Sequence, residues 1–136
     1  MKPILVDTNA YTAFLRGVPE IVTVFSSAEK LYVNSIVLGE LLGGFAAGSR
    51  EGSNRAQLTK FLDSPRVDVY SISQATADSY ALVYVALRRK GVPIPSNDMW
   101  IAASALEHGA SLLSLDSHFA HVEGLRHGRC IEDFLP

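Results

Sequence analysis

Near its N-terminus the chain reads Ile4-Leu5-Val6-Asp7-Thr8-Asn9, three apolar residues followed by three polar ones. A short and wholly apolar run of this kind is typical of a strand that is buried on both faces of a parallel sheet. The polar residues that follow it are suited to a turn or a helix cap. The sequence therefore predicts a first strand that ends at Asp7.

Short apolar runs and helical segments continue to alternate along the rest of the chain. Further strands are expected at 31–33, 67–72 and 111–115. Helices are expected at 10–15, 20–27, 36–47, 74–90 and 98–108, with a shorter one around Leu58 after a polar connection at 48–54. Such alternation indicates a parallel sheet with helices on both faces, joined by right-handed crossovers.

The ends of several elements are also predicted. Ser35 is suited to cap the helix at 36–47, Ser73 the helix at 74–90, and either Ser96 or Asn97 the helix at 98–108. The strand at 67–72 alternates apolar and polar residues, so we expect it to have one exposed face and to lie near an edge of the sheet.

Length and composition favour one ordered domain. The chain has 136 residues, of which 48% are hydrophobic and 19% charged, and this excludes disordered and low-complexity classes. A single cysteine, Cys130, excludes an intramolecular disulfide and the usual structural zinc sites. The apolar run at the start is too short for a signal peptide or a membrane span, so we expect a cytoplasmic protein with no membrane contact.

Four carboxylates, Asp7, Glu40, Asp98 and Asp116, are the candidate functional residues. Asp7 and Asp116 each follow an apolar strand, and sites in open parallel sheets form beyond the carboxyl ends of the strands. Asp98 begins a helix and can face the same rim. Glu40 lies among apolar and glycine neighbours, so we expect its carboxylate to be half-buried and to need a partner such as a cation.

The chemistry expected of these acids is metal-dependent hydrolysis. Taken singly, each acid also suits a turn, a cap or a surface position, but together they would repel one another. The net charge of −2 gives no general attraction to a polyanion, which would need a basic patch or a bound metal. Carboxylate oxygens favour Mg²⁺ or Mn²⁺, and such an ion can activate water for attack on a phosphodiester.

Three polar side chains stand beside two of these acids. Thr8 and Asn9 follow Asp7, and Ser114 precedes Asp116 at a distance of two residues. They are suited to orient the acids or a metal-bound water, and equally to simple turn and cap roles.

The segments Val6-Asp7-Thr8-Asn9, the apolar helix around Glu40, Ser96-Asn97-Asp98-Met99-Trp100-Ile101-Ala102-Ala103 and Leu113-Ser114-Leu115-Asp116-Ser117-His118-Phe119 together resemble the PIN-domain ribonucleases. More narrowly, they resemble the VapC-type toxins of toxin–antitoxin pairs, over essentially the whole chain. The resemblance implies one PIN domain over 1–136 with a three-layer α/β/α fold and a central parallel sheet of four to five strands.

The resemblance also implies an activity and partners. These are a Mg²⁺- or Mn²⁺-dependent endoribonuclease, acting on tRNA, rRNA or mRNA as the toxin of a type II toxin–antitoxin system, a homodimer, and a cognate antitoxin that occupies the active-site groove. By position, the four acids of the family fall on Asp7, Glu40, Asp98 and Asp116, and its small polar residues on Thr8 with Asn9 and on Ser114. Some family sites carry a further acid where Ser117, His118 and His121 stand here.

Other residues leave alternatives open. Arg88 and Arg89 could contact RNA phosphates, but basic residues at a helix end also complement its dipole. His118 and His121 are spaced to share a helical face, yet further soft ligands for zinc are missing. Apolar side chains of the first three helices could form a groove for a partner helix, although core packing accounts for most of them.

Two further classes of function compete with the toxin hypothesis. Asp7 after a first strand also suits an aspartyl nucleophile of a phosphoryl-handling enzyme, but such sites need a second acid beside the first and a late lysine, both missing here. The same fold could also serve as a housekeeping PIN nuclease, or as a non-catalytic module that binds RNA or protein.

Overall fold

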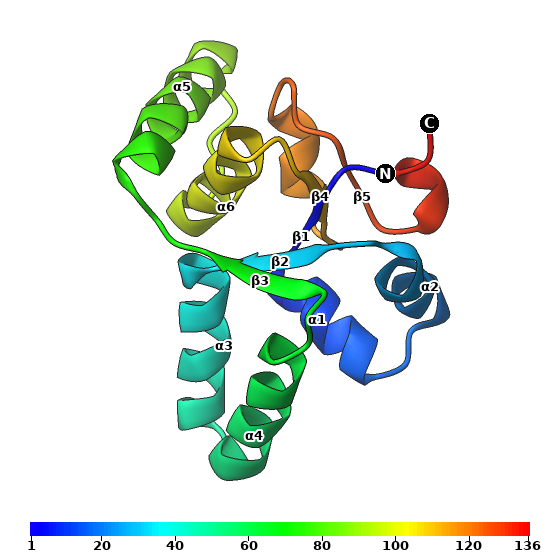
Figure 1. The fold of residues 1–136 in the computed structure, drawn as a ribbon. Coiled ribbons are helices and arrows are strands. Elements are labelled where there is room, and N and C mark those ends of the chain that lie inside the picture. Colours follow the sequence, from blue (N-terminus) through cyan, green and yellow to red (C-terminus); the bar gives the residue numbers. More distant parts are fainter.

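The computed structural model describes residues 1–136, and its centre is a five-stranded parallel sheet (Figure 1). The strands are β1 (Ile4–Val6), β2 (Leu31–Asn34), β3 (Val67–Tyr70), β4 (Ser111–Leu113) and β5 (His127–Gly128), in the order β3-β2-β1-β4-β5. The helices are α1 (Thr8–Leu15), α2 (Pro19–Ser27), α3 (Ser35–Ala47), α4 (Glu51–Leu62), α5 (Gln74–Lys90) and α6 (Ser96–Glu107), followed by the 3-10 helices η1 (Ser117–His121) and η2 (Ile131–Asp133).

Helices cover both faces of this sheet, which confirms the three-layer α/β/α prediction. In Figure 1, α5 and α6 lie above β2 and β3, whereas α1, α3 and α4 lie below them. No helix of the chain combines the length and the apolar character that crossing a membrane requires.

The central position of β1 explains its apolar sequence. All three of its residues are fully buried, and it pairs with β2 on one side and β4 on the other, with Ile4 opposite both Leu31 and Ser111. A strand with neighbours on both edges and helices on both faces has no contact with water. Asp7, the residue that follows β1, therefore lies at the edge of the sheet, directly after a strand in the middle of the core.

The two outer strands differ in how well the sequence predicts them. β3 is an edge strand as expected, with Val67 buried and Asp68 and Val69 exposed. β5 was not predicted, because its two residues, His127 and Gly128, carry no strand pattern. It pairs with Leu112 and Leu113 of β4 and so covers the other side of that strand.

Three predicted helix starts were wrong. The cap of α3 is Asn34, not Ser35: the Asn34 side chain is fully buried and accepts a hydrogen bond of 2.9 Å from the Val37 N–H. The predicted connection at 48–54 is largely helical, because α4 begins at Glu51. α6 starts at 96 directly after Pro95 and has no side-chain cap.

The capping role of Asn34 gives a stability prediction. Asn34→Ala should lower the free energy of unfolding by about 1–2 kcal/mol, because the Val37 N–H loses its acceptor at a buried helix start. Urea denaturation measures this change. Ser35→Ala, at the neighbouring exposed position, is the control and should cost less than about 0.5 kcal/mol. The reverse ranking of the two variants would contradict the assignment.

Candidate active site

The four predicted acids come together at the edge of the sheet where the strands end. Asp7 follows β1 directly, and Asp116 follows β4 and caps η1. Asp98 stands in the first turn of α6, and Glu40 lies inside α3. The charge of Asp98 acts on Asp7, and those of Glu40 and Asp116 act on Asp98, whereas the group of donor atoms that lie within 4.8 Å of one another contains Asp98 and Asp116 but not Asp7 or Glu40.

Asp7 is the most deeply placed of the four, with 5% of its surface exposed. Its carboxylate accepts hydrogen bonds of 2.7 Å from the Ser114 hydroxyl and 2.8 Å from the Thr8 N–H. Burial raises the pKa of Asp7 to about 6, against the lowering effect of these two donors, and the charges of Asp98 and Glu40 raise it further. Asp7 is thus a carboxylate whose ionised form would be favoured by nearby positive charge.

Glu40 is half-buried, as its apolar surroundings predict. Its carboxylate accepts hydrogen bonds of 2.5 Å from the Thr8 hydroxyl and 3.2 Å from the Asn97 side-chain amide. Both donors are neutral, so they fix the orientation of Glu40 without balancing its charge. The role of Asn97 was missed, because the sequence offered it only as a helix cap and its partner is 57 residues away.

Asp98 and Asp116 are joined by an imidazole that the sequence reasoning did not include in the site. His118 Nδ1 lies 3.1 Å from Asp98 Oδ2 and 3.1 Å from Asp116 Oδ1. Its hydrogen bond to Asp98 raises the pKa of His118. Burial raises the pKa of Asp98, against the lowering effect of His118, and the charge of Asp116 raises it further. The sequence signals for this contact were the position of His118 two residues after Asp116 and its place where some PIN-domain sites carry a further acid.

Ser114 and Asn9 connect the ends of β1 and β4. The Ser114 hydroxyl, which is buried, donates to Asp7 and accepts a hydrogen bond of 3.0 Å from the Asp116 N–H. Asn9 Oδ1 accepts a hydrogen bond of 3.0 Å from the Leu115 N–H. These contacts hold the backbones that carry Asp7 and Asp116 at a fixed separation.

The donor set of the cluster fits a divalent cation. One donor atom each from Asp98, Asp116 and His118 lies within 4.8 Å of the others. No lysine or arginine forms an ion pair with any of the four acids, and His118 is their only basic partner. Converging carboxylates without fixed positive charge are the arrangement that Mg²⁺ and Mn²⁺ sites use.

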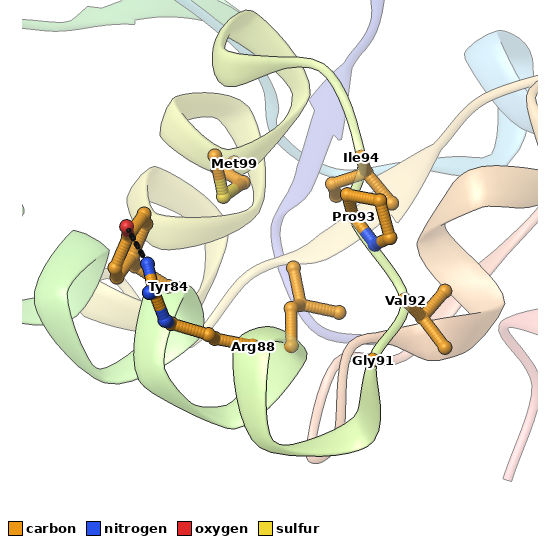
Figure 2. Close-up of a pocket in the computed structure, with 8 residues that line it drawn as sticks. Tyr84, Arg88, Gly91, Val92, Pro93, Ile94 and Met99 are labelled. Carbon is orange, nitrogen blue, oxygen red and sulfur yellow. Dashed lines mark hydrogen bonds between the residues drawn. The ribbon is translucent and has the colours of Figure 1, made fainter.

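Neither of the two predicted RNA-contacting arginines forms an ion pair or a hydrogen bond with the four acids. Figure 2 shows the Arg88 side chain extending to Tyr84 on the preceding turn of α5, where it donates a 2.8 Å hydrogen bond to the Tyr84 hydroxyl. Arg89 is exposed on the same helix end. The hollow in Figure 2, of about 280 Å³, is bordered mainly by apolar side chains of α5, the 91–94 segment and Met99, and none of the four acids lines it.

Comparison with known proteins gives matches over most of the chain. A family model described as the PIN domain matches residues 4–125. Ribonuclease VapC4 of Mycobacterium tuberculosis is 35% identical over 89 residues, which are 65% of this chain and 68% of the relative. Ribonuclease VapC1 of Rickettsia felis is 29% identical over 125 residues, 90% of this chain and 92% of the relative.

Solved structures agree with these matches at the level of the fold. The VapBC2 complex of Rickettsia felis, solved with a DNA fragment from its promoter, superposes with a TM-score of 0.82 at 22% identity, covering 94% of this chain and 98% of that one. VapBC-1 of nontypeable Haemophilus influenzae gives the same TM-score at 23% identity, covering 93% and 97%.

The raised pKa of Asp7 predicts how stability depends on pH. Between pH 4 and 6 the folded chain holds a proton on Asp7 that the unfolded chain releases, so ionisation of Asp7 costs stability as the pH rises. In the presence of a chelator and above pH 6, the free energy of unfolding of Asp7→Asn should therefore exceed that of the parent by on the order of 3 kcal/mol, as measured by urea denaturation. Near pH 4 the two free energies should be equal. Asp78→Asn, on the exposed face of α5, is the control. An equal effect of Asp7→Asn at pH 4 and pH 7.5 would contradict the prediction.

Proposed function

The chain belongs to the PIN domain family, and from this premise we propose that it is a metal-dependent endoribonuclease, the toxin of a type II toxin–antitoxin system. The observation that carries the proposal is the convergence of Asp7, Glu40, Asp98 and Asp116 without a lysine or arginine to balance them. Relatives named ribonuclease VapC, which match up to 90% of the chain, support RNA as the substrate class. We propose a single PIN domain over residues 1–136 that acts in the cytoplasm.

The metal site is proposed to consist of Asp98, Asp116 and Asp7, with Glu40 at its border. Carboxylate oxygens of this number suit Mg²⁺ or Mn²⁺. An ion bound there would supply an activated water and would stabilise negative charge on the phosphate and the leaving oxygen. Positive charge at the cluster also favours the ionised form of Asp7, whose pKa is otherwise raised to about 6.

Neighbouring side chains hold these carboxylates in place. The Ser114 hydroxyl donates to Asp7, and the Thr8 hydroxyl and Asn97 amide donate to Glu40. Each oxygen of the Asp7 and Glu40 carboxylates accepts one such hydrogen bond, which restricts the rotation of the carboxylate and leaves its further lone pairs for a cation. Asn9 acts one step further away, through the backbone at Leu115.

RNA would approach this acidic edge against its own negative charge. The bound metal supplies part of the compensation, and Arg88 and Arg89 are the proposed contacts for flanking phosphates. Arg88 is exposed and tethered only to Tyr84, so a phosphate can compete for its guanidinium. RNAs such as tRNA, rRNA or mRNA are the proposed substrates.

An apolar hollow supports the proposed antitoxin partner. It has a volume of about 180 Å³ and includes Phe14, Phe25 and Phe61 in its lining. Phe14 and Phe25 stack with ring centroids 4.0 Å apart, and the Arg66 guanidinium donates to the Phe25 carbonyl oxygen at its border. Such a surface accepts apolar side chains of a partner segment.

The outer face of α5 supports the proposed homodimer. Leu82 is 74% exposed and Val85, three residues further along the helix, is 41% exposed, so the two share a face. A cluster of exposed apolar side chains on one helix is typical of a surface that another protein covers.

One alternative is a housekeeping PIN nuclease, and another is a non-catalytic PIN module that binds RNA or protein. A small open reading frame overlapping or just upstream of the gene would favour the toxin, and its absence would favour the housekeeping enzyme. Expression tests distinguish the non-catalytic module from the nuclease. In a non-catalytic module, Glu40→Ala and Asp98→Ala would leave the biological effect of expression unchanged. Loss of both metal binding and growth inhibition in those variants would support the toxin.

The proposed nuclease activity predicts a specific pattern of losses. Purified protein should cleave RNA with Mg²⁺ or Mn²⁺ and should stop when a chelator is added. Asp98→Asn and Asp116→Asn should each lower the cleavage rate by at least about a hundredfold, because even outer contacts to metal ligands are worth ten- to a hundredfold. Gel analysis of labelled RNA measures the rate, and Asp78→Asn should keep it. Cleavage that survives both the chelator and Asp7→Ala would disprove the proposal.

The proposed dimer predicts a change of mass in solution. Leu82→Glu combined with Val85→Glu should convert a dimer into a monomer, since two charges would be buried in the interface. Size-exclusion chromatography with light scattering gives the mass. Leu15→Glu adds the same charge at another exposed apolar position, on α1, and should leave the dimer intact. A double variant that remains dimeric would exclude this face of α5.

A further inference from the structure

One side chain of the acidic cluster differs in chemistry from the rest. His118 places an imidazole nitrogen 3.1 Å from an oxygen of Asp98 and 3.1 Å from an oxygen of Asp116. These three donor atoms lie within 4.8 Å of one another, which is the spacing of ligands that share one metal ion. The group therefore combines two hard oxygens with one softer nitrogen.

The position of His118 is fixed by its place in the fold. It stands in η1, whose first turn is capped by Asp116: the Asp116 carboxylate accepts a 2.9 Å hydrogen bond from the His118 N–H. The next residue, Phe119, is fully buried and anchors η1 to the core. The imidazole itself is 48% exposed, so the ring is accessible from solvent while its backbone is held.

Nitrogen and oxygen ligands select different divalent ions. Mg²⁺ prefers oxygen ligands and gives up its waters reluctantly. Imidazole nitrogen is a softer donor that transition-metal ions accept more readily than Mg²⁺ does, and among these ions Mn²⁺ is the one that also suits carboxylate oxygens. Replacing one oxygen of a carboxylate site by nitrogen therefore weakens it for Mg²⁺ relative to Mn²⁺.

We propose that His118 is a nitrogen ligand of the metal site and that it makes the site prefer Mn²⁺ to Mg²⁺. The inference rests on the proposed metal-dependent function and names the ion for it. Zinc is not the ion proposed, because His118 is the only histidine in the group of potential ligands and no thiolate stands with it. His121, three residues further along η1, is outside the group.

The test compares metal binding by the full chain after removal of bound ions with a chelator and dialysis. Mn²⁺ is titrated alone and followed by the electron paramagnetic resonance signal of the free ion, and Mg²⁺ is titrated alone by calorimetry. His118→Asn should weaken Mn²⁺ binding by about tenfold or more and change Mg²⁺ binding by less than about twofold, because asparagine offers an oxygen in place of the nitrogen. His121→Asn is the matched control on the same short helix and should bind both ions as the parent does.

A spectroscopic signature tests the ligand directly. Electron spin echo envelope modulation of bound Mn²⁺ should contain coupling to a directly bound ¹⁴N nucleus in the parent and in His121→Asn, and should lack it in His118→Asn. Absence of this coupling in the parent, or unchanged Mn²⁺ affinity in His118→Asn, would overturn the inference and leave His118 as a hydrogen-bond partner of two acids.

These readouts are independent of RNA cleavage. A parent chain that cleaves RNA with a metal but lacks the ¹⁴N coupling retains the proposed function and overturns only the role of His118. A chain that binds Mn²⁺ through nitrogen but cleaves no RNA retains the role of His118 and contradicts the nuclease.

Discussion

The buried carboxylate of Asp7 is the constraint on which the rest of the site depends. It follows a strand that is fully enclosed, and its two hydrogen-bond donors, Ser114 and Thr8, belong to the two segments that border it. A buried carboxylate is costly unless donors or positive charge compensate it. Here the two donors compensate in part for the cost of burying the charge. The part that they leave uncompensated raises the pKa of Asp7 to about 6. The fold thus holds a carboxylate where burial alone would protonate it.

The remaining acids increase the cost of burying the Asp7 charge. The residues proposed to act in the site are therefore also residues that lower the stability of the fold. Asp98 interacts unfavourably with the charges of Glu40 and Asp116, and no lysine or arginine relieves the repulsion. A cluster selected only for folding would not keep four carboxylates together. Stability lost at such a cluster is recovered when a cation binds the folded chain and not the unfolded one.

The sequence predicted the parts of this site that depend on local pattern. Asp7 and Asp116 follow apolar strands, and the half-burial of Glu40 follows from its apolar neighbours. The contacts of Asn97 and His118 could not be predicted in this way, because each depends on how two distant elements pack. The prediction of Ser35 as a cap was wrong for a related reason: Asn34 and Ser35 can both cap a helix, and only the position of the chain around them decides which one does.

The order of the strands has a consequence for the chain while it is being made. β1 is synthesised first, but its neighbour β4 and the acid that follows it come more than a hundred residues later. At a synthesis rate of about 5–20 residues per second, one side of β1 lacks its pairing strand for roughly 5–20 seconds. The nascent chain lacks Asp98 for most of that interval and Asp116 for all of it, so the acidic cluster is incomplete until β4 and the residues after it have been made. The carboxylates that the proposed activity needs are therefore brought together only late in synthesis.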